Sequence, residues 1–140
     1  MVAALVIPTV ARATGSFDYK MQVTPEEGPL NPKVESRYTA AFSQCQKRVQ
    51  VTSENAACFE AELQRQDAQL NKAWRSTLPR FSPEMRRSLL EAQRKWIRER
   101  DPFCMKNSDG FSGGTIAPVV YVSCRVELTI RRTIWLEQLR

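Results

Sequence analysis

Apolar residues recur at helical spacing along most of the chain after residue 32, which predicts amphipathic helices. A first short helix is predicted over 33–49. A longer one is predicted to begin with Thr52 or Ser53 as its N-cap and to close at Pro79. The apolar positions of this longer helix are Phe59, Leu63, Leu70, Trp74 and Leu78.

A third helix is predicted from Pro83 to about Arg100. Ser82 provides the N-cap, and Pro83 occupies the first helical position, where its missing N–H costs nothing. Asp101-Pro102 is expected to break or kink this helix. The glycine-rich stretch 107–117 then predicts an exposed loop.

The last segment, 119–140, is ambiguous. Apolar residues alternate with polar ones in the manner of a strand, at Val122, Cys124, Val126, Leu128 and Ile130. The segment contains no Gly, Pro, Asn or Asp, and a lone strand has no obvious partner elsewhere in the chain. The pattern therefore leaves both structures open and favours a long buried helix.

The N-terminal quarter of the chain differs from the rest in its composition. Residues 2–10 are an apolar run, and Ala11-Arg12-Ala13 fits a signal-peptidase site, so 1–13 is predicted to be a truncated signal peptide. An apolar, disordered N-terminus is the alternative. Prolines and glycine break up 14–37, which predicts a flexible arm before a helical domain over 38–140. No other stretch approaches the roughly 18 apolar residues of a membrane span.

Four cysteines and no histidine narrow the possible chemistry. An even cysteine number in a short chain indicates two disulfides and an oxidising compartment. Three pairings are possible, and we favour the sequential one, Cys45 with Cys58 and Cys104 with Cys124, because it closes two short loops. Each bridge would contribute at most about 3 kcal/mol. A zinc site is the alternative, but the spacing lacks a C-x2-C pair.

The same composition argues against an enzyme. Gly110 to Gly114 matches the G-x-S-x-G nucleophile motif in letters only, because that motif needs a histidine base. Acidic pairs such as Glu60/Glu62 stand two apart, so on a helix they point to different faces. We therefore expect no catalytic residue, no cofactor and no metal. The loop instead offers a contact surface, at Asp109, Phe111, Ser112, Gly113 and Gly114.

The chain is basic, with 21 Lys and Arg against 15 Asp and Glu, for a net charge of +6. This balance favours anionic partners. The basic residues between Arg86 and Arg100 spread round the predicted helix and are interleaved with Glu91 and Glu99, and no nucleic-acid motif accompanies them. We expect an anionic envelope polymer or a lipid headgroup, and not nucleic acid, as the electrostatic partner.

The ordered sequence from about residue 38 to 140 resembles the LprI-like family of small exported bacterial proteins. The residues that carry the resemblance are Cys45, Cys58, Asp67, Leu70-Asn71, Trp74, Leu78, Ala92-Gln93, Trp96, Arg100-Asp101, Cys104, Gly113-Gly114-Thr115, Cys124, Thr129, Arg132 and Leu136. The resemblance implies an all-α, compact bundle of about four helices with two disulfides, in which the last segment is helical. Trp74, Pro102 and Thr115 depart from the family pattern, and no lipobox cysteine supports a lipid anchor.

The polar members of this pattern are Asp67, Asn71, Gln93, Arg100, Asp101, Thr129 and Arg132, with Trp96 among them. Polar groups on faces that also carry tryptophan are expected to be partly buried, so they must bond one another. We favour a structural network that fixes helix packing. A ligand pocket lined by the same side chains is the alternative.

These observations predict a periplasmic or secreted, non-catalytic binding module. The resemblance implies that its partner is a lysozyme, whose cleft it would plug, or another envelope protein. The alternative is an envelope protein that binds anionic polymers or surfaces through its basic faces. Animal lysozymes are themselves basic, so inhibition would require acidic side chains clustered locally on this protein.

Overall fold

The computed structural model describes residues 32–139, which contain helices and no strand. The elements are α3 (Pro32–Glu35), α4 (Ala40–Gln46), α5 (Thr52–Thr77), the 3₁₀ helix η2 (Leu78–Arg80), α6 (Pro83–Ser108), the 3₁₀ helix η3 (Asp109–Phe111) and α7 (Ala117–Gln138). The all-α, disulfide-linked bundle predicted from the sequence is confirmed.

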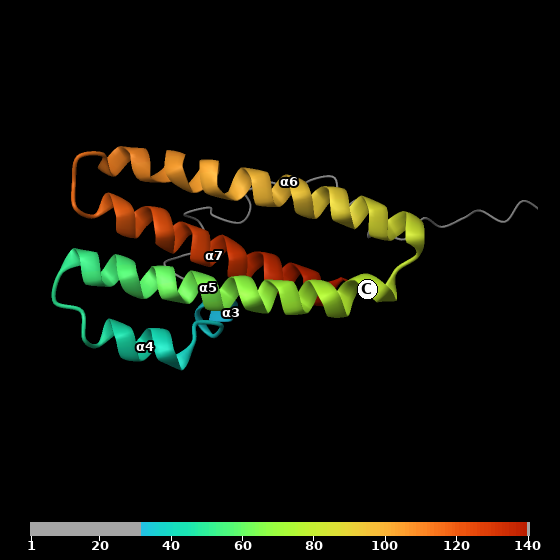
Figure 1. Ribbon diagram of the computed structural model, residues 1–140, viewed down its shortest axis with the longest axis horizontal. Coiled ribbons are helices and arrows are strands. Elements are labelled where there is room, and N and C mark those ends of the chain that lie inside the picture. The colour runs from blue at the N-terminus through green and yellow to red at the C-terminus, as the bar shows by residue number, and fades with distance from the viewer. Residues whose placement is uncertain (1–31, 140) are drawn as a thin grey trace, which may run out of the picture.

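Helix α7 lies in the middle of the bundle. Figure 1 shows α5 and α6 running along α7 on either side of it, with the short α4 beyond α5. Both α5 and α6 pack against α7 and approach one another far less closely. The start of α5, the start of α7 and the connection from α6 to α7 therefore gather at one end of the molecule.

The ambiguous C-terminal segment is helical, as the resemblance implied. Val126, Leu128 and Ile130 are fully buried although they lie on different sides of α7. An alternating pattern arises here because neighbouring helices cover α7 on several sides, so its apolar residues are not confined to one stripe. The strand alternative is wrong.

The core divides into two clusters around α7. One is built from α5, α6 and α7 and includes Leu70, Trp96 and Leu128. The other lies between α3, α5 and α7 and includes Val34 and Leu63, with further residues of α7. Val34 is only 1% exposed, although 32–37 was predicted to be the end of a flexible arm. The predicted signal peptide and the rest of that arm lie outside the described residues.

The predicted helix over 33–49 is two helices, α3 and α4, separated by residues 36–39, and Thr39 marks the start of α4. This residue is extended and caps α4, its Oγ1 accepting a hydrogen bond from the Phe42 N–H at 3.1 Å. The carboxylate of buried Glu62 accepts bonds from both the N–H and the Oγ1 of Thr39. These bonds hold Thr39 in an extended conformation, so α4 begins here as a separate helix and does not continue α3.

The helix-start predictions fare differently at α5 and α6. Ser82 caps α6 as predicted, accepting a hydrogen bond from the Met85 N–H at 3.3 Å. At α5 the N-cap is Val51, not Thr52 or Ser53. The Glu54 carboxylate supplies the missing polar group, because it accepts bonds from the N–H groups just before the helix, including that of Val51 at 3.4 Å.

Pro102 does not end α6, contrary to the prediction, and the helix continues to Ser108. Proline cannot donate to the carbonyl four residues earlier, that of Arg98. Both Pro102 and Arg98 are exposed, so water can donate a hydrogen bond to the Arg98 carbonyl in place of the missing N–H. Beyond Pro102, buried Cys104 holds the helix against α7 through its disulfide. The exposed connection to α7 is consequently shorter than predicted.

The cysteines form the sequential pairs. Cys45 on α4 is bonded to Cys58 on α5, with Cα atoms 5.7 Å apart, and Cys104 on α6 is bonded to Cys124 on α7, at 5.6 Å. The zinc alternative is therefore wrong, because no thiolate remains to hold a metal. Within residues 32–139 no helix is long and apolar enough to cross a membrane.

Candidate functional site

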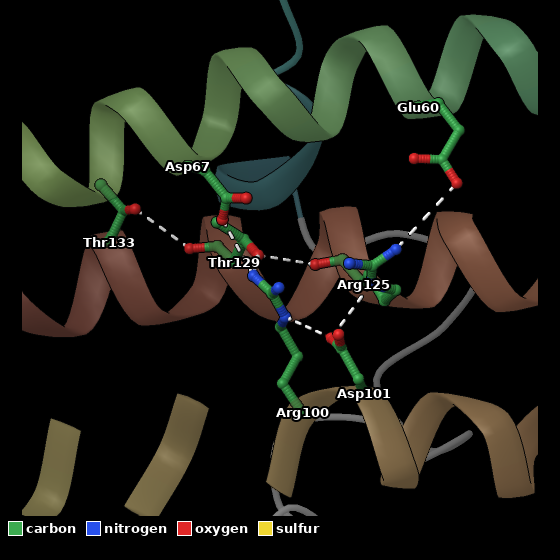
Figure 2. Close-up of polar contacts among 7 residues, drawn as sticks. All are labelled: Glu60, Asp67, Arg100, Asp101, Arg125, Thr129 and Thr133. Atoms are coloured by element: carbon green, nitrogen blue, oxygen red, sulfur yellow. Dashed lines mark hydrogen bonds and ion pairs between the residues drawn. The ribbon is translucent and has the colours of Figure 1, made fainter. Parts of the chain in front are cut away.

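Four of the polar residues singled out in the sequence meet where α5, α6 and α7 come together. Arg100 of α6 donates from Nη1 to Asp67 of α5 at 2.9 Å and to Thr129 of α7 at 3.1 Å. Its Nε donates to Asp101 at 2.8 Å. Figure 2 shows these side chains converging over the middle of α7. One guanidinium group thus joins three helices.

Arg125 extends this group and was not predicted. Its Nε donates to Asp101 at 3.0 Å, and its Nη1 lies 4.0 Å from a carboxylate oxygen of Glu60 on α5. The Oγ1 of Thr129 donates to the Arg125 backbone carbonyl at 2.7 Å. Once 119–140 is treated as a helix, Arg125, Thr129 and Arg132 fall at steps of four and three on one face. That spacing is the signal that could have identified Arg125.

Arg132, Gln93 and Trp96 form an adjoining buried group. Arg132 Nε donates to Gln93 Oε1 at 2.8 Å, which links α7 to α6. The Arg132 guanidinium lies 3.9 Å from the ring centre of Trp135 and 5.7 Å from that of Trp96. The Arg100 guanidinium lies 5.4 Å from the same Trp96 ring. The two polar groups are therefore joined through one buried indole.

Asn71 does not belong to this network, contrary to the prediction, because it is exposed. It lies one turn after Asp67 on α5, but a helix advances about 100° per residue, so four residues leave it about 40° further round. Asp67 already lies at the edge of the buried face, with its side chain 41% exposed. The extra rotation places Asn71 in solvent.

The charges in this network hold one another ionised. Burial alone would raise the pKa of Asp101, but the hydrogen bond and charge of Arg100, together with Arg125, outweigh it and lower that pKa. Burial would also lower the pKa of Arg100, and Asp101 and Asp67 raise it instead. Paired charges of this kind fix the register of helices and are poorly suited to proton transfer, because each group is already committed to a partner.

A second network, centred on Glu62, escaped the sequence analysis. Its carboxylate is fully buried and accepts four hydrogen bonds: two from Thr39, one from Arg65 Nε and one from Gln66 Nε2. Burial opposes ionisation, but these bonds outweigh it and hold the pKa of Glu62 below its ordinary value. The sequence signal was its position three residues after Phe59, on the apolar face of α5.

The predicted contact residues Asp109, Phe111, Ser112, Gly113 and Gly114 are all exposed in the connection from α6 to α7. The turn requires glycine at Gly113, whose φ of +82° lies in the left-handed region. The Gly114 N–H then donates to the Phe111 carbonyl at 3.0 Å. The Cys104–Cys124 disulfide joins the two helices that bear this turn. The loop is short and is anchored on both sides.

Val51 is the N-cap of α5, Phe111 ends η3 and Ile116 is the N-cap of α7, and all three side chains are exposed. The start of α5, the start of α7 and the connection from α6 to α7 lie at the same end of the bundle (Figure 1). A shallow apolar hollow of about 480 Å³ lies between the start of α5 and the start of α7, and Val51, Thr115 and Pro118 are among the residues that line it. Exposed apolar groups gathered on a rigid frame are typical of protein-binding surfaces. We refer to Val51, Phe111 and Ile116 as the apolar end.

Within the described part of the chain, no three His, Cys, Asp or Glu side chains are placed to hold an ion together. Fold and site together define a small, disulfide-linked helical scaffold with an exposed, anchored loop between α6 and α7. The chain belongs to the LprI family: the family model described as "Lysozyme inhibitor LprI" matches residues 43–136. No curated protein and no solved structure matches the chain.

Proposed function

We propose that the protein is an exported, non-catalytic module that binds and inhibits lysozyme through the apolar end. The family description supports the partner. The exposure of Phe111 and Ile116 on an anchored loop is the observation that supports the surface. Binding there has a low entropic cost, because the disulfide already restricts the loop before a partner arrives. The two disulfides support an extracytoplasmic location.

The first test is a lysozyme activity assay with the purified, oxidised protein against a panel of animal and bacterial lysozymes. Inhibition at micromolar concentration by the wild-type protein is the expected result. No inhibition across the panel would remove the proposal.

A matched pair of variants tests the surface. Phe111→Ser should weaken inhibition by about 10- to 30-fold, as expected for an interface anchor worth about 1.4 to 2 kcal/mol. Ile97→Ser is the control, because Ile97 is exposed to a similar extent, 55% against 48% for Phe111, but lies on α6 away from the loop. Equal inhibition by the two variants would show that the partner binds elsewhere.

A second function, binding of anionic envelope polymers, is supported by the outward side of α6. Arg87, Arg94 and Arg98 are exposed there and lie at helical spacing, while the opposite side of α6 packs against α7. Charge-driven binding should collapse as salt rises well above 0.15 M, whereas apolar plugging of a cleft should largely persist. Arg94→Gln/Arg98→Gln should weaken polymer binding and leave lysozyme inhibition unchanged.

A further inference from the structure

A second hollow lies on the side of the bundle that carries α3 and α4, and none of the residues of the Arg100 network lines it. It is bounded by α3 and α4 on one side and by α5 and α7 on the other. Its volume of about 420 Å³ falls in the range of small-ligand sites. The lining residues are Glu35, Tyr38, Phe42, Ser43, Phe59, Ser123 and Glu127.

Aromatic rings form the wall of this hollow. The ring centres of Tyr38 and Phe42 are 4.9 Å apart, and those of Phe42 and Phe59 are 4.8 Å apart. All three side chains are half-buried, so each is packed against the protein and still reaches the surface. The face of an aromatic ring carries partial negative charge and attracts cations.

Two carboxylates complete the hollow. Glu35 is exposed. Glu127 accepts hydrogen bonds from Arg131 Nε and Nη2, both at its Oε1 atom. Burial raises the pKa of Tyr38, and the negative charges of Glu127 and Glu62 raise it further against the opposing charge of Arg131. The hollow thus places two carboxylates, one of them paired with Arg131, beside a wall of aromatic rings on a protein of net charge +6.

We propose that this hollow binds an arginine side chain of a protein partner. A guanidinium group is planar, so it can stack on the ring wall of Tyr38 and Phe42 while its N–H groups reach Glu35 and Glu127. The hydroxyl of Ser43 offers a further acceptor. The site does not depend on lysozyme being the partner. A basic partner would nevertheless gain here the local attraction that the net charge of the protein denies it.

The test is an NMR titration of the ¹⁵N-labelled, oxidised protein with Nα-acetyl-arginine amide. Saturable shifts confined to residues around the hollow are expected. The matched probe is Nα-acetyl-citrulline amide, which has nearly the same shape but is neutral, and it should produce no saturable shift. Equal shifts with both probes, or no localised shift with the arginine probe, would overturn the proposal.

Variants separate the hollow from general charge effects. Glu35→Gln/Glu127→Gln should weaken arginine binding at least five-fold. The control, Glu84→Gln/Glu91→Gln, removes the same charge from exposed positions on α6 and should bind as the wild type does. Phe42→Leu keeps both carboxylates and should weaken binding by removing the central ring. Circular dichroism verifies the fold of each variant. If the Glu35→Gln/Glu127→Gln variant bound the arginine probe as tightly as the wild type does, the proposal would be refuted.

Discussion

Replacement of Glu62 by glutamine isolates the contribution of one buried negative charge. The side chain keeps its size, but one carboxylate oxygen becomes an NH₂ group that faces donors instead of accepting from them. Of the four bonds that Thr39, Arg65 and Gln66 donate, about two should be lost. Each hydrogen bond to a charged group contributes roughly 1.5–3 kcal/mol to stability. The Thr39 hydroxyl can recover part of this loss by rotating to accept a hydrogen bond from the new NH₂ group. We expect Glu62→Gln to lower the free energy of unfolding by about 2–4 kcal/mol at pH 7.

The effect should depend on pH in a definite direction. The folded-state pKa of Glu62 lies below its ordinary value of 4.5. Ionised Glu62 therefore contributes its full stability above about pH 4.5, and that stability is lost as the pH falls through the lower, folded-state pKa. A protonated glutamic acid side chain resembles glutamine, because in both only one oxygen is a pure hydrogen-bond acceptor and the other position carries hydrogen. The difference between the wild type and Glu62→Gln should accordingly shrink at low pH.

Urea denaturation of both proteins at pH 7 and near pH 3, with disulfides intact, measures this difference. Glu84→Gln is the control, because Glu84 has a side chain 75% exposed and should change stability by less than about 0.5 kcal/mol. Hydrogen exchange should locate the loss in α4, whose cap depends on Glu62. A Glu62→Gln effect below 0.5 kcal/mol at pH 7, or one of equal size at both pH values, would refute the reasoning.

Three further predictions concern α6 and its neighbours. Pro102→Ala restores a hydrogen-bond donor to the Arg98 carbonyl and should raise the free energy of unfolding by at least about 1 kcal/mol, measured by urea denaturation. A loss of stability would contradict the conclusion that Pro102 lies in α6 at the cost of one helical hydrogen bond. Arg100→Lys keeps the charge but cannot span three helices, so it should cost about 2–4 kcal/mol, and a cost under 1 kcal/mol would show that the network is dispensable. Replacing Cys104 and Cys124 together by alanine should cost about 3 kcal/mol and speed exchange of the loop amides, whereas unchanged loop exchange would show that the bridge does not anchor the loop.

Much of the fold could be predicted because its signals are local. Ser82 followed by Pro83 marks a helix start through the chemistry of those two residues alone. The cysteine pairs could be favoured from their short separations. The grouping of Asp67, Arg100 and Thr129 was predicted as one set from the family pattern, although neither spacing nor composition could say which atoms bond.

The errors arose where a distant residue decides the local structure. The separate start of α4 at Thr39 depends on Glu62, 23 positions away, and the helix propensities within 33–49 do not reveal it. Pro102 appears to end a helix in any local reading, but tertiary packing and solvent exposure keep it within α6. Arg125 was missed because it is not among the residues that carry the family resemblance, and only its helical spacing to Thr129 and Arg132 indicates that it shares their face.

The central place of α7 sets the order in which the molecule can acquire its structure. Because α5 and α6 rest mainly on α7, neither has its main packing surface until α7 has been synthesised. The segment that contains α5 and α6 is therefore expected to stay loosely packed until α7 emerges and joins them. Truncation within α7 would leave two helices with nothing between them.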